Sequence, residues 1–127
     1  MLRRLISDHV IKQSPTCGEI REILRGTDYS PNVAIVLNIQ TTTPHFHRTF
    51  EEIYFVLDGT LRLKFYDPKS NAFSEQTLAA NELCVIPVGV HHQVVEASPE
   101  NRLCVITVPR FDPADEHVST FLASSPV

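Results

Sequence analysis

The chain has 127 residues, of which 43% are hydrophobic and 20% are charged, and its formal net charge at pH 7 is −4. These values are ordinary for a globular protein, and we expect a single domain over residues 1–127. The acidic balance and the absence of a clustered basic stretch exclude a nucleic-acid-binding surface.

The cysteines and the first residues indicate where the protein works. Cys17, Cys84 and Cys104 are odd in number and lack Cys-x-x-Cys spacing, so they predict neither a disulfide framework nor a thiolate zinc site. Free thiols favour a reducing compartment, and we expect a cytoplasmic location. Polar residues interrupt residues 1–12, which therefore predict an N-terminal arm and neither a signal peptide nor a membrane span.

Short β-branched or alternating segments between turn residues predict an all-β fold, a small antiparallel barrel or jelly roll with its core over about residues 33–108. We expect strands at residues 19–24, 33–40, 52–57, 61–66, 74–78, 83–86, 92–96 and 102–108. Asp58-Gly59 is typical of a short hairpin turn between two of them. Asp112 as a cap and Pro113 at the first helical position predict a short C-terminal helix over about residues 113–124.

Two histidines in the sequence Thr43-Pro44-His45-Phe46-His47 indicate a metal site. On a strand, His45 and His47 point to the same face, with Cα atoms roughly 7 Å apart. Both imidazoles can then reach one ion at a bond length of about 2.0–2.1 Å. Glu52 adds an oxygen ligand, and His92 adds a third nitrogen if the fold returns its strand beside the first.

These residues carry a family resemblance. His45-x-His47, Glu52 and Gly59 resemble the first motif of the cupin superfamily, and the segment 87–92, Pro-x-Gly-x-x-His, resembles the second. The resemblance implies a small antiparallel β-barrel that holds one divalent transition metal ion through His45, His47, Glu52 and His92. Three imidazoles and one carboxylate suit iron(II), manganese, nickel, cobalt or zinc.

The chain departs from the family pattern outside the ligand positions. Ile39 and Asn81 replace the glycines that open the two motifs, and Glu96 replaces the asparagine that closes the second. Asparagine tolerates left-handed backbone, so the change at Asn81 is mild. Glu51 is the alternative to Glu52 as a ligand, but it points to the opposite face of the strand, and the spacing to Gly59 favours Glu52.

Three further residues are candidates for catalysis. Tyr54 shares a strand face with Glu52, so it either lines the pocket with a free phenol or is a packed core residue. His91 and Glu96 are candidate bases, although His91 should face away from His92, which favours a rim or surface residue over a proton-transfer role. Arg25, Arg48 and Arg62 are the scattered candidates for binding an anionic group of a substrate.

The sequence supports two functional hypotheses. The first is a metal-dependent enzyme, of the dioxygenase or of the isomerase or epimerase type, acting on a small polar molecule inside the barrel. The alternative is a non-catalytic module that binds or senses a small ligand. In both cases we expect a homodimer with residues 1–12 at its interface, because apolar edge strands are commonly covered by a second copy.

Overall fold

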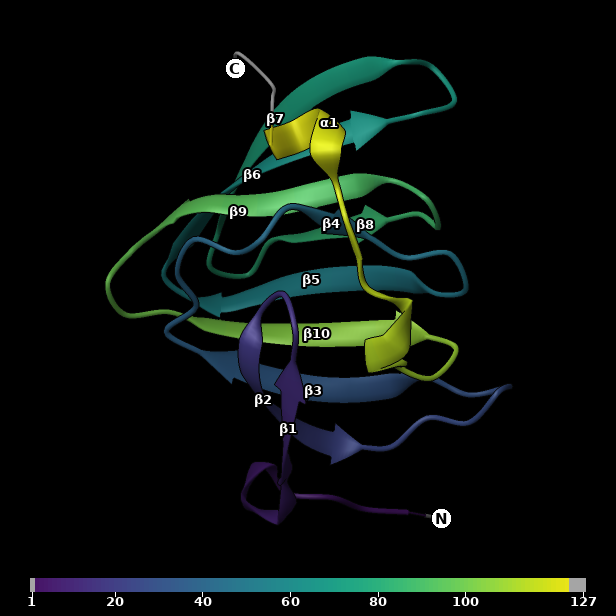
Figure 1. The fold of residues 1–127 in the computed structure, drawn as a ribbon. Helices are drawn as coiled ribbons and strands as arrows, with labels where there is room; N and C mark the ends of the chain where they lie inside the picture. Colours follow the sequence, from purple (N-terminus) through teal and green to yellow (C-terminus); the bar gives the residue numbers. More distant parts are fainter. Residues whose placement is uncertain (1, 124–127) are drawn as a thin grey trace.

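The computed structural model describes residues 2–123 (Figure 1) and consists of two antiparallel sheets that face each other. The first sheet contains six strands in the order β1 (Val10–Ser14), β2 (Gly18–Leu24), β3 (Asn32–Leu37), β10 (Arg102–Val108), β5 (Glu51–Asp58) and β8 (Leu83–Ile86). The second contains five, in the order β11 (His117–Val118), β4 (His45–Phe46), β9 (His91–Ala97), β6 (Thr60–Asp67) and β7 (Ala72–Ala79). The all-β jelly-roll prediction is confirmed, although the sheets form a sandwich and do not close into a continuous barrel.

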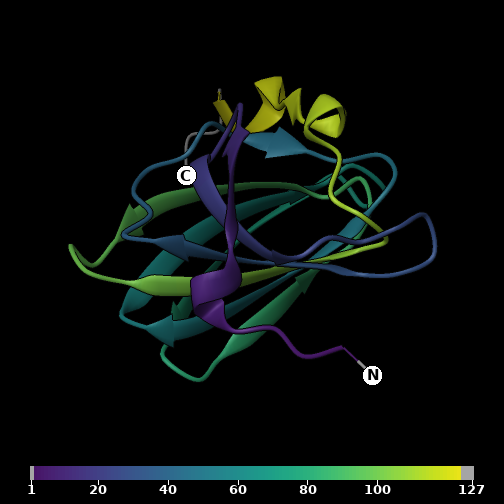
Figure 2. The same ribbon diagram turned by 90° about the horizontal axis from the view of Figure 1, so that it is seen from below.

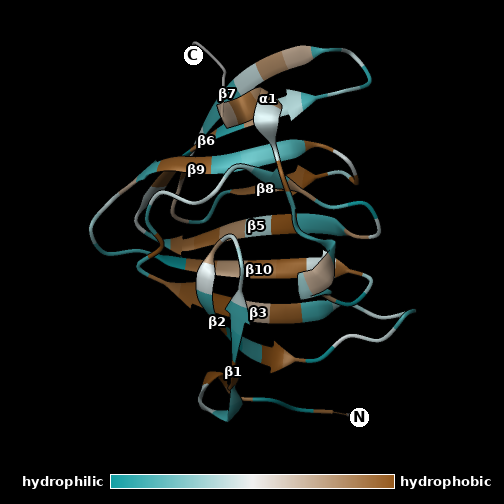
Figure 3. Ribbon diagram, in the orientation of Figure 1, coloured by the Kyte–Doolittle hydropathy of each residue, from teal (hydrophilic) through white to brown (hydrophobic). Residues whose placement is uncertain are grey.

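The core lies between the sheets because the strands alternate apolar inward and polar outward residues. On β5, Tyr54 and Val56 are buried, and on β6, Leu61 and Leu63 are buried. Figure 3 shows the brown, apolar stretches in the middle of β3, β5 and β10. No helix among residues 2–123 is long and apolar enough to cross a membrane.

The predicted hairpin at Asp58-Gly59 is wrong. β5 and β6 belong to different sheets, so the chain crosses from one sheet to the other at this point. Gly59 adopts a left-handed φ of 85°, and a Cβ there would lie 2.5 Å from the Ser98 hydroxyl and 2.6 Å from the Glu100 carbonyl oxygen. The dipeptide therefore marks a close backbone approach, for which glycine is needed.

The C-terminal segment differs from the continuous helix that the sequence predicts. Asp112 caps Ala114 as expected, with Pro113 in first position, but only a 3₁₀ turn, η2 (Pro113–Asp115), follows. The chain then forms β11 beside β4 and ends, within the described residues, in α1 (Thr120–Ala123). The helix breaks because Ser119 N donates to the Pro44 carbonyl, tying the segment to the second sheet. Residue 124 of the predicted helix lies outside the described residues.

The N-terminal arm begins with a 3₁₀ turn, η1 (Ile6–Asp8), and continues as β1, the edge strand of the first sheet. Figure 2 shows the turn between β1 and β2 beside the yellow C-terminal segment, at the end of the molecule where β4 lies. The two segments are joined by the hydroxyl of Ser14, which lies 2.9 Å from both carboxylate oxygens of Glu116. The β1–β2 turn and the segment that contains Glu116 therefore cover the same end of the sandwich.

Candidate metal centre

Three histidines and one glutamate meet at the end of the sandwich where β4 lies. One ligand atom from each of His45, His47, Glu52 and His92 lies within 4.8 Å of the others, and all four side chains are at most 5% exposed. His45 and His92 are direct register partners across β4 and β9, whereas Glu52 comes from β5 of the opposite sheet. The group thus joins the two sheets, as the four-ligand hypothesis requires.

Each histidine is oriented by a backbone carbonyl that accepts from its Nδ1. The acceptors are Thr43 for His45 at 2.7 Å, Asp115 for His47 at 2.8 Å and Val90 for His92 at 3.2 Å. A carbonyl only accepts, so Nδ1 carries the proton and Nε2 of each ring is the atom left for the group. This is the arrangement that metal-binding histidines adopt in proteins.

Two of the inward nitrogens have no hydrogen bond. His45 Nε2 and His92 Nε2 are buried without a hydrogen-bond partner among the described residues, although His92 Nε2 lies only 3.0 Å from Glu52 Oε1, where two unprotonated acceptors would face each other. Burying an unsatisfied polar atom is costly, so such atoms need an explanation. Because both nitrogens lie in one cluster with a carboxylate, a divalent transition metal ion supplies that explanation, and the residues fit such an ion.

The protonation of the group also suits metal binding. Burial, and then the neighbouring His92, lowers the pKa of His45 to about 3, so this imidazole is neutral. Burial opposes ionisation of Glu52, but its contacts with His47 and His92 outweigh burial and hold its pKa well below the usual range. Burial likewise opposes protonation of His47, but Glu52 outweighs it, accepts from His47 Nε2 at 3.0 Å, and raises the pKa of His47. An ion bound at this position would replace that proton.

The loop that carries His47 is fixed by Asp115, which the sequence did not mark as important. The Asp115 carboxylate accepts from the backbone N of Arg48 and Thr49, at 3.0 and 2.8 Å, and from the Thr49 hydroxyl. Its backbone carbonyl accepts from His47. Burial raises the pKa of this carboxyl, but the hydrogen bonds outweigh burial and lower it to about 2. No sequence signal connects residues 47 and 115, because 68 positions separate them.

A small cavity adjoins Glu52 on the inner face of the first sheet. It contains about 30 Å³ of space for water-sized molecules, which is room for about one or two waters. Its polar lining includes Glu52, Tyr54 and Thr107, together with Ser14 and Glu116 from the two covering segments. Burial raises the pKa of Glu116, although the hydrogen bond from Ser14 opposes this shift. The rest of the lining is largely apolar and includes Ile20, Ala34, Val36, Ile39, Leu103, Val105 and Phe111.

The structure brings one of the three candidate catalytic residues to this cavity. Tyr54 lines it, with its ring edge-on to His92 at a centroid distance of 5.8 Å. His91 faces the other side of the second sheet, where it stacks on Phe46 at 4.2 Å and lies 2.6 Å from the hydroxyl of Ser119. It is therefore covered by the C-terminal segment and does not reach the metal group.

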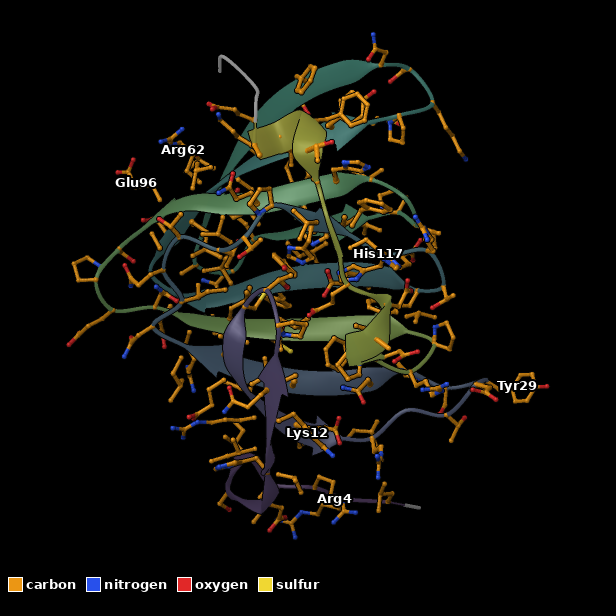
Figure 4. The ribbon with its side chains drawn as sticks, viewed as in Figure 1. Arg4, Lys12, Tyr29, Arg62, Glu96 and His117 are labelled. Atoms are coloured by element: carbon orange, nitrogen blue, oxygen red, sulfur yellow. The ribbon has the colours of Figure 1, made fainter. Side chains whose placement is uncertain are left out.

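Glu96 also points away from the group. A β-bulge between β6 and β9 pairs Arg62 with Glu96 and Leu63 with Val94, so the alternation that buries His92 and Val94 is reversed at Glu96. The Glu96 carboxylate meets Arg62 at 3.2 Å on the surface, as Figure 4 shows. The structure thus removes the geometric basis for Glu96 as a base.

None of the three candidate arginines lines the cavity. Arg62 is held at the surface by Glu75 and Glu96. Arg25 is exposed and lines a separate surface pocket with Lys12 and Arg110. The Arg48 guanidinium lies 5.4 Å from the ring centroid of Phe46. The cavity therefore has no cationic side chain for an anionic substrate.

The comparison with protein families agrees with this geometry. The model of the family described as "Cupin domain" matches residues 35–109, more than half of the chain. The protein therefore belongs to the cupin family, and the expectation from its two motifs is confirmed. No curated protein matches the chain.

Solved structures show the same fold. A protein from Planctomyces limnophilus has a TM-score of 0.70 and 27% identity, covering 92% of this chain and 96% of its own. The capsular polysaccharide assembling protein CapF from Staphylococcus aureus has a TM-score of 0.68 and 19% identity, with coverage of 87% and 34%. Oxalate decarboxylase from Bacillus subtilis has a TM-score of 0.70 and 17% identity, with coverage of 95% and 33%. The chain spans about a third of the latter two proteins, so they support the fold alone.

Proposed function

We propose that this protein is a metal-dependent enzyme, of the dioxygenase or isomerase type, acting on a small polar molecule in the cavity beside Glu52. The observation that carries the proposal is the position of two buried Nε2 atoms, that of His45, which has no hydrogen-bond partner among the described residues, and that of His92, which lies 3.0 Å from the Glu52 carboxylate next to that cavity. A structural ion would be closed off by its ligands, whereas this cavity leaves space beside Glu52 at the ligand group.

The residues of the chain have distinct parts in this proposal. His45, His47, Glu52 and His92 would hold iron(II), manganese, nickel, cobalt or zinc, and the bound ion supplies Lewis-acid polarisation or one-electron chemistry. Burial raises the pKa of Tyr54 well above its ordinary value, so its phenol stays protonated and can donate a hydrogen bond to a substrate.

Glu116 is the group best placed to hold or move a proton. It lines the cavity, and burial raises the pKa of its carboxyl, which favours the protonated form relative to an exposed glutamate. We therefore assign the role of acid or base to Glu116 instead of His91 or Glu96, because both of those side chains face away from the ligand group.

Metal analysis tests the proposal first. Protein purified without added ions should contain about one divalent metal ion per chain, and His47→Ala and Glu52→Ala should each lose most of it. The control is Glu51→Ala, on the same strand as Glu52 but outside the ligand group, which should keep its ion. A full complement of ion in both ligand variants would refute the metal site.

Turnover is the second test. Protein loaded with iron(II), manganese or nickel should convert a member of a panel of sugars, catechols, thiols and oxo acids. Failure on the whole panel, together with a molecule recovered chemically unchanged from the purified protein, would favour the alternative of a binding or sensing module. The observation that supports that alternative is the largely apolar lining of the cavity, which offers few groups for a reaction.

We also propose a cytoplasmic homodimer. Its support is the apolar N-terminal arm, where Leu2, Leu5, Ile6, Val10 and Ile11 are each at least 50% exposed, beside the unpaired edge of β1. A second copy of this chain is the simplest partner that would cover the edge of β1. All three cysteines are free thiols, which suits a reducing compartment. A stable monomer at micromolar concentration in light scattering would refute the dimer.

A further inference from the structure

A second pocket lies between β1 and β2 of the first sheet and the segment that follows β10. It contains about 190 Å³ of space for water-sized molecules, which is room for several waters or for one small molecule. None of the four residues of the metal group lines it, and it shares only Asn32 and Phe111 with the cavity beside Glu52. The pocket is therefore a site separate from the metal group.

One wall of this pocket is fixed by contacts between Arg110 and the loop after β2. The backbone N of Arg110 donates to the Thr27 carbonyl at 3.1 Å, and the guanidinium Nε donates to the Asp28 carboxylate at 2.8 Å. The two segments also touch at Gly26, where a Cβ would lie 2.9 Å from the Cα of Arg110. Packed backbone therefore holds this wall in place.

Glu22 is an unexplained charge in the pocket. It lies on an interior strand, between Val10 of β1 and Ala34 of β3, and it is 8% exposed. Although it lines the pocket, its carboxylate has neither a hydrogen bond nor an ion pair among residues 2–123. A buried carboxylate without a partner is costly, so a donor in the pocket would stabilise it.

Two cations of the pocket have no partner either. Lys12 and Arg25 line it and form no hydrogen bond or ion pair within the described part of the chain. Because neither of them pairs with Glu22, the positive and negative groups face one space without neutralising each other. Asn32 adds a donor, since its Oδ1 accepts from the backbone N of Gly26 at 3.0 Å and leaves its amide NH₂ group for a ligand.

We propose that this pocket binds a small zwitterionic amino acid. Its ammonium group donates to Glu22, and its carboxylate accepts from Lys12 and Arg25. A simple anion would leave Glu22 unpaired and would be repelled by it, whereas a simple cation would be repelled by the two basic side chains. Phe111 and Pro113 are the apolar part of the lining, which suits a short aliphatic side chain. The metal group takes no part, so the inference does not rest on the proposed function.

The test compares free L-valine with 3-methylbutanoate, which lacks the ammonium group, and with isobutylamine, which lacks the carboxylate. Calorimetric titration of the purified protein gives the affinities, and backbone amide NMR shifts locate the bound molecule. Valine should bind at least about tenfold more tightly than either partial probe, because each of them loses a charge-assisted hydrogen bond. The largest shifts should fall within residues 22–26 and 110–112. Equal binding of a partial probe, or no saturable binding of valine at millimolar concentrations, would overturn the inference.

Two variants assign the charges. Glu22→Gln should remove most of the advantage of valine over 3-methylbutanoate, whereas Arg25→Gln, at an exposed position that the fold does not need, should weaken both of these probes and spare isobutylamine. The control is Glu19→Gln, on the same strand but outside the pocket, where Glu19 meets Arg21 at 3.5 Å. It should bind valine as the wild type does. Unchanged valine binding in both pocket variants would place the molecule elsewhere and overturn the inference, while the metal content of the same samples tests the proposed function separately.

Discussion

Replacing Asp115 by alanine should weaken both the fold and the metal site. The Asp115 carboxylate accepts hydrogen bonds from the backbone N of Arg48 and Thr49, the Thr49 hydroxyl and His117 Nε2. Alanine removes all of these acceptors but keeps the backbone carbonyl that accepts from His47. The variant thus loosens the loop after His47 without deleting the direct contact to the ligand.

The size of the effect follows from the pKa of Asp115. The folded protein lowers it from 3.8 to about 2, and this difference corresponds to about 2 kcal/mol of stability at neutral pH. The same hydrogen bonds lower this pKa, so their loss is not counted twice, and the upper end of the range allows for one amide that water cannot reach, at about 1–3 kcal/mol. We therefore expect the free energy of unfolding to fall by about 2–4 kcal/mol.

Urea unfolding at pH 7 and calorimetric titration with zinc measure the two effects. Metal affinity should fall about 10- to 100-fold, as it does when the groups that orient metal ligands are removed. Asp112→Ala is the control, because it removes only the cap of η2 and should cost about 1 kcal/mol with little change in affinity. An unfolding free energy within 0.5 kcal/mol of the wild type, taken as roughly the size of an ordinary surface effect, would refute the reasoning.

The pH dependence gives an independent check. A carboxyl whose folded pKa is lowered stabilises the protein above its ordinary pKa, and this stabilisation is lost as the pH falls through the folded value. The deficit of Asp115→Asn relative to the wild type should therefore be complete above about pH 4 and shrink as the pH falls towards 2. A deficit that does not change with pH would mean that the charge of Asp115 contributes nothing.

Two further predictions concern backbone and assembly. Gly59→Ala should cost at least about 2 kcal/mol in urea unfolding, because its Cβ would meet the Ser98 hydroxyl at 2.5 Å, whereas Gly18→Ala, with a similar φ and open space, should cost about 1 kcal/mol. Equal costs would contradict the close approach. Val10→Lys on β1 should shift a dimer towards monomer in light scattering, and an unchanged dimer would exclude this edge.

The ligand set was predictable from sequence because its chemistry is encoded in local spacing. Two histidines at i and i+2 on a strand share a face, and the structure places His45 and His47 together, although His47 follows directly after the two-residue strand β4. The groups that orient them were not predictable. The acceptor for His47 comes from Asp115, on a segment that reaches the site only because β11 pairs with β4. Such a contact depends on topology, which local patterns do not contain.

The failed predictions have the same origin. Asp58-Gly59 has the composition of a hairpin, but local turn chemistry does not decide whether the flanking strands pair with each other or enter different sheets. Glu96 lies at an even spacing from His92 and would share its face on a regular strand, but one bulge reverses it. The apolar residues Val118, Phe121 and Leu122 have helical spacing, but Val118 pairs with His45 of β4 and therefore adopts an extended strand conformation. Tertiary contacts override the local preference in each case.

The crossing of β5 to the opposite sheet is what makes the metal group possible. If β5 and β6 formed a hairpin, Glu52 would extend from the same sheet as His45 and His92, and its carboxylate would lie beside them. Because β5 belongs to the first sheet, Glu52 faces the histidines across the core and has Thr107 as its neighbour. The same crossing that sequence reasoning missed therefore places the carboxylate between the three histidines and the cavity.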